Sequence, residues 1–148
     1  MKKVILILAI LSAHLGANAQ TARGSVNVGA NYNLIVSKDG VMIYVKSIRG
    51  KSSDDSAKIM WQVKNNTNKP IFLEGNYQAT GKPITGTYMN GEPAGKSRIS
   101  DSLPGSKVNA SSSEEFETYA EEMNEVNSIT VNLEKVYKGD NIKSGSGN

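Results

Sequence analysis

The sequence contains no cysteine, and its single histidine, His14, lies in an apolar segment at the N-terminus. If that segment is removed, the remaining protein has neither a thiol nor an imidazole. This excludes disulfide bonds, cysteine nucleophiles, histidine-dependent catalytic triads and zinc sites built from cysteine and histidine. The sequence therefore predicts a protein that is not an enzyme, with no catalytic residues, no metal site and no cofactor.

The sequence also lacks a large excess of positive or negative charge. The 148 residues carry a formal net charge of +3. Removing residues 1–19, which include Lys2 and Lys3, leaves 15 basic residues against 14 acidic ones. This balance gives no basis for binding nucleic acid or an anionic membrane, because both require clustered positive charge. We expect no nucleic-acid partner, and no membrane insertion once the segment is removed.

Residues 1–19 have the three parts of a secretory signal peptide. A pair of lysines gives a positive start, residues 4–15 form an apolar run, and Ala17 and Ala19 are the small residues that define a cleavage site. The run is too short for a membrane anchor, which needs roughly 20 apolar residues. The pattern predicts cleavage before Gln20 and export to the periplasm or beyond, in a Gram-negative bacterium.

Short apolar runs separated by turn residues occupy residues 31–137 and predict one all-β domain. Alternating apolar residues give most of these runs one buried face. The expected strands are Tyr32–Val36, Val41–Ile48, Ile59–Lys64, a strand that starts at Pro70, Thr85–Met89, Arg98–Leu103 and Thr130–Val136. About seven strands of this kind predict an antiparallel β-sandwich. Its predicted core contains Ile43, Val45, Ile59, Trp61, Val63, Ile71, Leu73, Ile129, Val131 and Leu133.

One stretch late in the chain breaks the alternation. Phe116, Tyr119, Ala120 and Met123 fall at the spacing of one helical face, and a serine followed by a glutamate three residues later resembles a capping box. The pattern predicts a short helix over residues 113–124. A strand in which Phe116 and Ala120 share a face remains the alternative.

Both ends of the mature chain are small and polar. Residues 20–30 and residues 138–148 contain few large apolar side chains, and the second segment ends in alternating serine and glycine. Such segments bury too little apolar surface to offset the entropy of ordering the chain. We expect a mobile N-terminal segment and a disordered tail on either side of the sandwich.

The middle of the chain resembles exported bacterial immunoglobulin-like domains. The run from Trp61 to Ile71, WQVKNNTNKPI, has an alternating strand, an asparagine-rich turn and a proline-led next strand, and Leu103-Pro104-Gly105 resembles a proline-glycine corner late in such domains. The resemblance implies an immunoglobulin-like fold in which Trp61 packs at the sandwich centre. Two departures are the absence of a cysteine pair and the predicted helix.

Two tyrosines are the candidate ligand-binding residues. Tyr44 lies on the face opposite Val41, Ile43 and Val45, and Tyr88 lies in a glycine-rich stretch, so both rings are free to stack on a sugar. Trp61 shares its face with core residues and is expected to be buried. The acidic residues are expected to form a solvated surface, because no two are placed to face each other across a substrate.

These observations favour a non-enzymatic binding or structural module of the cell envelope. The alternative is a carbohydrate-binding module that uses the tyrosines and the glycine-rich loop. The expected partner is accordingly an envelope protein or a glycan. Neither the sequence pattern nor the resemblance fixes the partner's identity, because this fold serves many functions.

Overall fold

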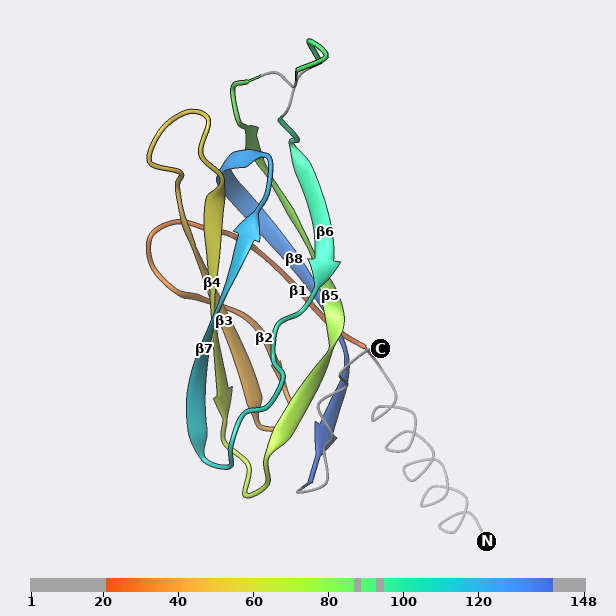
Figure 1. The fold of residues 1–148 in the computed structure, drawn as a ribbon. Coiled ribbons are helices and arrows are strands. Elements are labelled where there is room, and N and C mark those ends of the chain that lie inside the picture. Colours follow the sequence, from red (N-terminus) through yellow and green to blue (C-terminus); the bar gives the residue numbers. More distant parts are fainter. Residues whose placement is uncertain (1–20, 87–88, 93–94, 140–148) are drawn as a thin grey trace, which may run out of the picture.

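The computed structural model describes residues 21–86, 89–92 and 95–139. Within these residues the chain forms eight strands and no helix, so no described helix is long and apolar enough to cross a membrane. The strands, labelled in Figure 1, are β1 (Ala22–Asn27), β2 (Asn33–Lys38), β3 (Val41–Ile48), β4 (Ala57–Asn65), β5 (Ile71–Pro83), β6 (Arg98–Ser102), β7 (Ser112–Ala120) and β8 (Met123–Lys138).

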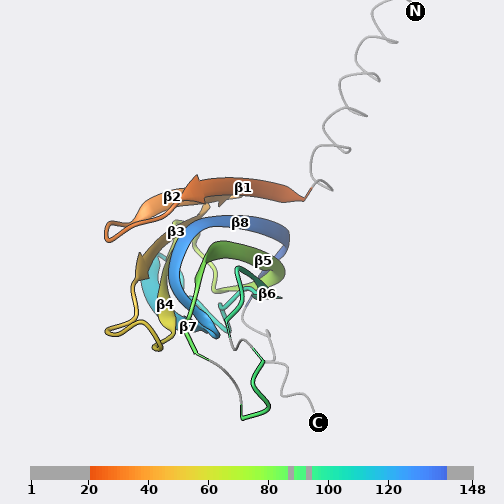
Figure 2. The same ribbon diagram turned by 90° about the horizontal axis from the view of Figure 1, so that it is seen from above.

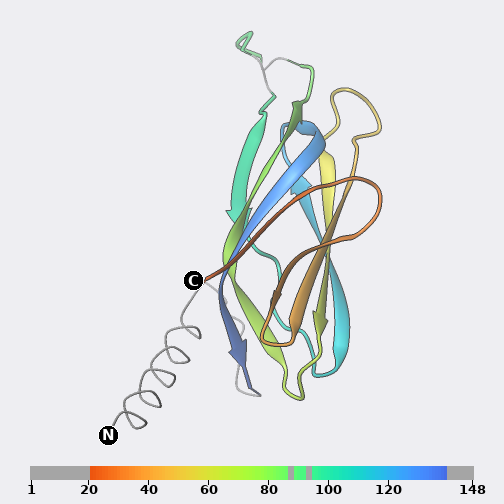
Figure 3. The same ribbon diagram turned by 180° about the vertical axis from the view of Figure 1, so that it is seen from behind.

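The strands form two antiparallel sheets that pack face to face. Sheet A has the order β1-β8-β5-β6, and sheet B has the order β2-β3-β4-β7. In the view of Figure 3 the two sheets form separate layers, with sheet A on the left. The all-β, two-sheet architecture predicted from the sequence is therefore confirmed, with four strands in each sheet.

The core lies between the sheets and is centred on an aromatic pair. Trp61 on β4 and Tyr77 on β5 are fully buried, and their ring centroids are 4.9 Å apart. Alternate residues are buried along the whole of β4 and along β3 from Val41 to Val45, as a half-buried sheet requires. All ten residues of the predicted core are buried.

The predicted helix over residues 113–124 is wrong. Residues Ser112–Ala120 form β7, which pairs with β4, and a two-residue turn leads directly into β8 in the other sheet. The inward residues Phe116 and Ala120 match the strand that remained as the alternative. The turn takes its shape from Glu122, whose φ of 64° is in the left-handed region. Phe116, Ala120 and Met123 have helix-like spacing because the alternation of buried and exposed residues restarts at Met123, after the turn.

The N-terminal boundary also differs from the prediction. Residues Ala22–Asn27, expected to be mobile, form β1 and pair with β8 from Asn27 opposite Ser128 to Ala22 opposite Leu133. Val26 is half-buried and packs against the core, which gives the segment an apolar contact that composition alone did not reveal. The sandwich therefore begins before residue 31.

Two further differences lie in the second half of the chain. β5 continues to Pro83, and the described residues of the predicted strand Thr85–Met89, which are Thr85, Gly86 and Met89, are not in a strand. β8 begins at Met123 and is much longer than the predicted strand over Thr130–Val136. At its other end Lys138 still belongs to β8, while residues 140–148 of the predicted tail lie outside the described residues.

One side of the sandwich is sealed and the other is open. Where β1 passes β2, a Cβ atom on Gly24 would lie 1.7 Å from the carbonyl oxygen of Ile35, so only glycine permits this approach. Ile35 is the extra residue of a bulge in β2, between Leu34 and Val36. Figure 2 shows β1 and β2 running together along this side. On the opposite side the edge strands β6 and β7 belong to different sheets and are not paired with each other.

Candidate binding site at the loop end

Three connections gather at one end of the sandwich, at the top of Figure 1. They are the β3–β4 loop, the start and finish of the β5–β6 connection, and the β7–β8 turn. Backbone hydrogen bonds join them, because Thr85 N donates to Ser53 O (2.9 Å), and both Ile84 N (3.1 Å) and Lys96 N (2.8 Å) donate to Glu122 O. The end that carries these loops is therefore one connected surface.

Asn124 fixes the β3–β4 loop to the start of β8. Its side chain is only 5% exposed, and its Nδ2 donates to the carbonyl oxygens of Ser52 and Asp55. Its Oδ1 accepts a hydrogen bond from Arg49 Nε at 3.3 Å. Its backbone oxygen accepts from Gly50 N at 2.9 Å. A loop held at both ends by one buried amide presents its side chains in a defined arrangement.

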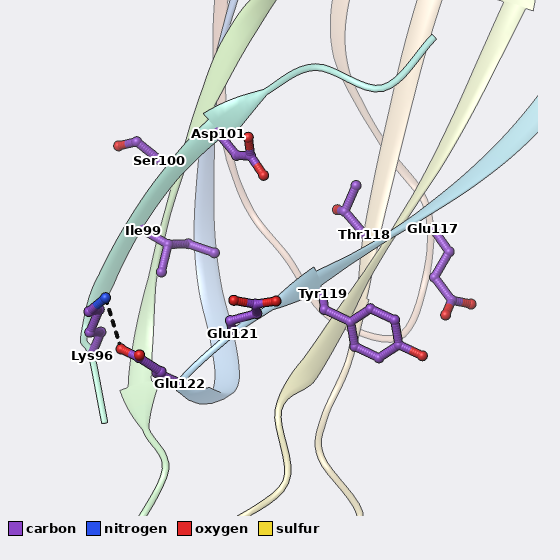
Figure 4. Close-up of a pocket in the computed structure, with 9 residues that line it drawn as sticks. All are labelled: Lys96, Ile99, Ser100, Asp101, Glu117, Thr118, Tyr119, Glu121 and Glu122. Carbon is purple, nitrogen blue, oxygen red and sulfur yellow. Dashed lines mark ion pairs between the residues drawn. The ribbon is translucent and has the colours of Figure 1, made fainter. Parts of the chain in front are cut away.

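A groove of about 430 Å³ lies on the open side, between β6 and β7 (Figure 4). Ile99 and Asp101 extend from β6 toward β7, and Thr118 lies across from them on β7. The Thr118 hydroxyl also accepts hydrogen bonds from Trp61 Nε1 (2.9 Å) and Tyr77 Oη (3.5 Å). Thr118 therefore links the wall of the groove to the core aromatic pair. Burial, with a smaller contribution from the charge of Asp101, raises the pKa of Tyr77.

Acidic side chains outnumber basic ones in the groove. Two carboxylates are paired, since Glu122 is 2.9 Å from Lys96 Nζ and Glu117 is 3.2 Å from Lys58 Nζ. Glu117 raises the pKa of Lys58 by its hydrogen bond and its charge. These pairs are exposed, so they orient side chains more than they stabilise the fold.

The other two carboxylates of the groove belong to Asp101 and Glu121. Neither forms an ion pair with any residue in the described part of the chain. One Asp101 oxygen accepts a hydrogen bond from the backbone of Ser102 at 2.7 Å. Both carboxylates are therefore available to accept hydrogen bonds from a hydroxyl, amide or cationic group of a ligand.

A second hollow of about 410 Å³ adjoins the groove, and Tyr119 lines both. The Tyr119 ring is 54% exposed and extends away from β6 (Figure 4). Ile48, which is 47% exposed, lines the second hollow together with Arg49 and Lys58. Lys58 Nζ lies 5.3 Å from the centre of the Tyr119 ring. An exposed aromatic ring thus stands between an acidic groove and a basic, partly apolar hollow.

This arrangement suits ligand binding. No three histidine, cysteine, aspartate or glutamate side chains come together to hold a metal ion within residues 21–86, 89–92 and 95–139. The ring of Tyr119 offers a flat apolar surface, and the flanking charges offer directional contacts. We refer to Tyr119 and the two hollows as the Tyr119 site.

Of the two tyrosines predicted to bind ligand, Tyr44 lines neither hollow of this site. Tyr44 and Tyr119 lie on the outer face of sheet B, on opposite sides of β4. Tyr44 pairs with Gln62 and Tyr119 pairs with Lys58, four residues away along β4. Lys64 Nζ is 5.1 Å from the Tyr44 ring centre. Tyr88 lies outside the described residues. Tyr119 was missed because the helical pattern assigned it to the core; strand alternation from Phe116 would have placed it outside.

Comparisons with known proteins give a likeness of fold. No model of a protein family matches the chain, and no curated protein matches it in sequence. Among solved structures the chain is similar to the Salmonella enterica trimeric lipoprotein SadB, with 11% identity and a TM-score of 0.52. The match covers 93% of this chain and 73% of SadB. At this identity the similarity concerns the arrangement of strands alone.

Proposed function

We propose that this protein is an exported, non-enzymatic binding module of the bacterial cell envelope, with an immunoglobulin-like sandwich that presents the Tyr119 site to a partner protein. The signal-peptide pattern of residues 1–19 supports export. SadB, a solved structure with a similar fold, is a bacterial lipoprotein, which agrees with an envelope location. The lack of histidine and cysteine after residue 19 supports binding over catalysis.

The observation that carries the proposal is the exposed ring of Tyr119 between two hollows of opposite charge. Tyrosine is enriched among the residues that dominate protein interfaces, where it fills a partner's pocket at low entropic cost. Ile48 adds an exposed apolar contact beside it, and the acidic groove and the basic hollow fix the orientation of a partner. The hydrogen-bonded loops hold these groups in place before binding, which lowers the cost of association.

A photocrosslinking experiment in the native host tests this proposal. Tyr119 is replaced by a photoreactive phenylalanine derivative, and a matched variant carries the same group at Tyr137, which is 41% exposed on sheet A. We expect one discrete protein adduct from position 119 and none from position 137. Equal adducts from both positions, or none from 119, would show that the Tyr119 site does not contact a protein.

A carbohydrate ligand is the second candidate, because one observation favours it. Sugar rings stack on exposed tyrosines, and the unpaired carboxylates of Asp101 and Glu121 can accept hydrogen bonds from sugar hydroxyls. A glycan array distinguishes the two candidates. Glycan binding that is lost in Tyr119→Ala and kept in Tyr44→Ala would replace the protein partner with a sugar.

A further inference from the structure

The outer face of sheet A carries an unusual set of side chains. Twelve residues point outward in three rows that cross all four strands in register. Ten are serine, threonine, asparagine or glutamine, and the other two are arginines at diagonal corners. The rows are Arg23-Asn132-Asn76-Ser102, Ser25-Thr130-Gln78-Ser100 and Asn27-Ser128-Thr80-Arg98. We refer to these twelve residues as the polar face.

Charge distinguishes the polar face from the rest of the surface. It contains no carboxylate and no lysine, whereas the whole chain has 14 acidic and 17 basic residues. Neither Arg23 nor Arg98 forms an ion pair with any other described residue. Two guanidinium groups therefore stand without an ion pair at the corners of the polar face, whose other ten members are neutral. The carboxylate of Glu134 borders the polar face and accepts a hydrogen bond from Asn76 Nδ2 at 3.3 Å.

Hydrogen bonds along the rows order the polar face before any ligand arrives. The hydroxyls of Ser25 and Thr130 are 2.9 Å apart, and Asn132 Nδ2 donates to Asn76 Oδ1 at 3.2 Å. The hydroxyls of Thr80 and Ser128 are hydrogen-bonded as well. These side chains are short and have few rotamers, so fixing them against a ligand costs little entropy. The polar face is therefore a prearranged hydrogen-bonding surface.

The chemistry of the polar face selects among possible occupants. A protein interface needs apolar or aromatic side chains at its centre, and the polar face has none. Nucleic acids and anionic membranes need many clustered cations, and the polar face has two. A polyhydroxylated chain matches the ten neutral side chains, and sparse anionic groups on that chain match the two arginines.

We propose that the polar face binds an acidic polysaccharide, with its sugar hydroxyls on the neutral side chains and its carboxylates on Arg23 and Arg98. On standard spacings the two arginines stand about 20 Å apart, because three strand-to-strand spacings across the sheet and four residues along the strands separate them. A ligand must therefore be a chain of several sugars to reach both. This surface lies on sheet A, whereas Tyr119 lies on sheet B, and of the twelve residues of the polar face only Ser100 also lines the groove of the Tyr119 site.

Binding to immobilised polygalacturonate, with immobilised dextran as the neutral counterpart, tests this inference on the mature protein. We expect binding to polygalacturonate, none to dextran, and a loss in affinity of at least about tenfold in Arg23→Gln/Arg98→Gln. Gln78→Glu places a negative charge at the centre of the polar face with almost no change in shape. We expect it to abolish binding.

The control variant is Lys69→Gln/Lys107→Gln, which removes the same amount of charge from exposed loop positions outside the polar face. It should bind polygalacturonate as the wild type does, and so should Tyr119→Ala. Thermal midpoints check that each variant folds. The inference is overturned if the wild type does not bind, if dextran binds equally, or if the control variant loses as much affinity as the double arginine variant.

Discussion

At the scale of single residues, the fold depends on a few buried groups with complete sets of partners. Trp61 combines apolar burial with a hydrogen bond from Nε1 to Thr118. Asn65 is also fully buried, and its Nδ2 lies within hydrogen-bonding distance of three carbonyl oxygens, those of Lys69, Val108 and Asn109. Within the described residues no buried side-chain nitrogen or oxygen lacks a partner. Replacing either residue should therefore cost more than its apolar area alone.

Trp61→Ala should be severely destabilising. It removes the largest fully buried side chain, leaves a cavity beside Tyr77, and deprives Thr118 of a donor. We expect a loss of about 3–5 kcal/mol in the free energy of unfolding, measured by urea denaturation. Met60→Ala, one residue away on the outer face of β4, should cost under about 1 kcal/mol.

Tryptophan fluorescence provides an independent reading of the same position. A buried Trp61 emits toward the blue and is poorly quenched by iodide. Full quenching in the folded protein, together with normal stability of Trp61→Ala, would contradict its placement in the core and would make it a surface residue available for binding.

Tyr32 should make stability depend on pH in the alkaline range. Desolvation, followed by the hydrogen bond from its hydroxyl to Glu115, raises its pKa from 10.0 to about 12. The folded state thus holds this proton more tightly than the unfolded state does. The resulting stabilisation is complete below pH 10 and is lost as the pH rises through about 12.

Tyr32→Phe lacks this proton, so its stability should fall less than that of the wild type between pH 10 and pH 12. Urea denaturation across this interval measures the difference, and an absorbance titration should show one late-titrating tyrosine fewer. The same alkaline loss of stability in both proteins would mean that the contact between Tyr32 and Glu115 does not form.

At the scale of elements, alternation in the sequence predicted strands well wherever one side of the strand is buried. β3 spans Val41–Ile48, as predicted, because Val41, Ile43 and Val45 recur at every second position and give the strand one buried face. The prediction failed at β7 and β8 because a two-residue turn shifted the phase of alternation, so that Phe116, Ala120 and Met123 imitated a helical face. A local pattern cannot show that two short segments belong to different sheets.

The Tyr119 site could not be predicted from the sequence for a related reason. The residues that line its two hollows come from β3, β4, β6, β7 and the connecting loops. The groove forms only because β6 and β7 are the edge strands on the same side of the sandwich. The polar face likewise depends on the register of four strands that are not consecutive. The sequence shows which side chains each strand carries, but it does not show which strands pair to bring these side chains together.

Gly24→Ala tests how β1 seals the side of the sandwich. The new Cβ atom would meet the backbone oxygen of Ile35, which cannot rotate away, so β1 and β2 must separate. We expect a loss of about 1–3 kcal/mol in the free energy of unfolding. Gly29→Ala is the matched control, because a Cβ atom there meets nothing within 4 Å. Equal stability of the two variants would show that the seam is not tightly packed.

At the scale of the whole molecule, the sandwich combines one sealed side with one open side. The contact of β1 with β2 protects two strand edges, and edge strands left bare are prone to pair with other chains. On the open side, the outward residues of β7 include the carboxylates of Glu115 and Glu117, which discourage such pairing. The molecule therefore presents its binding groove beside an edge that resists aggregation.

Removing residues 21–30 tests where the folded domain begins. A chain that starts at Asn31 keeps the whole domain expected from the sequence, but it lacks β1. It loses the pairing with β8, the half-buried side chains of Val26 and Val28, and the hydrogen bond from Ser47 N to Gly29 O. We expect it to be less stable than a chain starting at Thr21 by at least about 3 kcal/mol. The thermal midpoint should fall by roughly 10 °C, as calorimetry can measure. Equal midpoints would show that residues 21–30 are dispensable, and the boundary predicted from composition would then be the correct one.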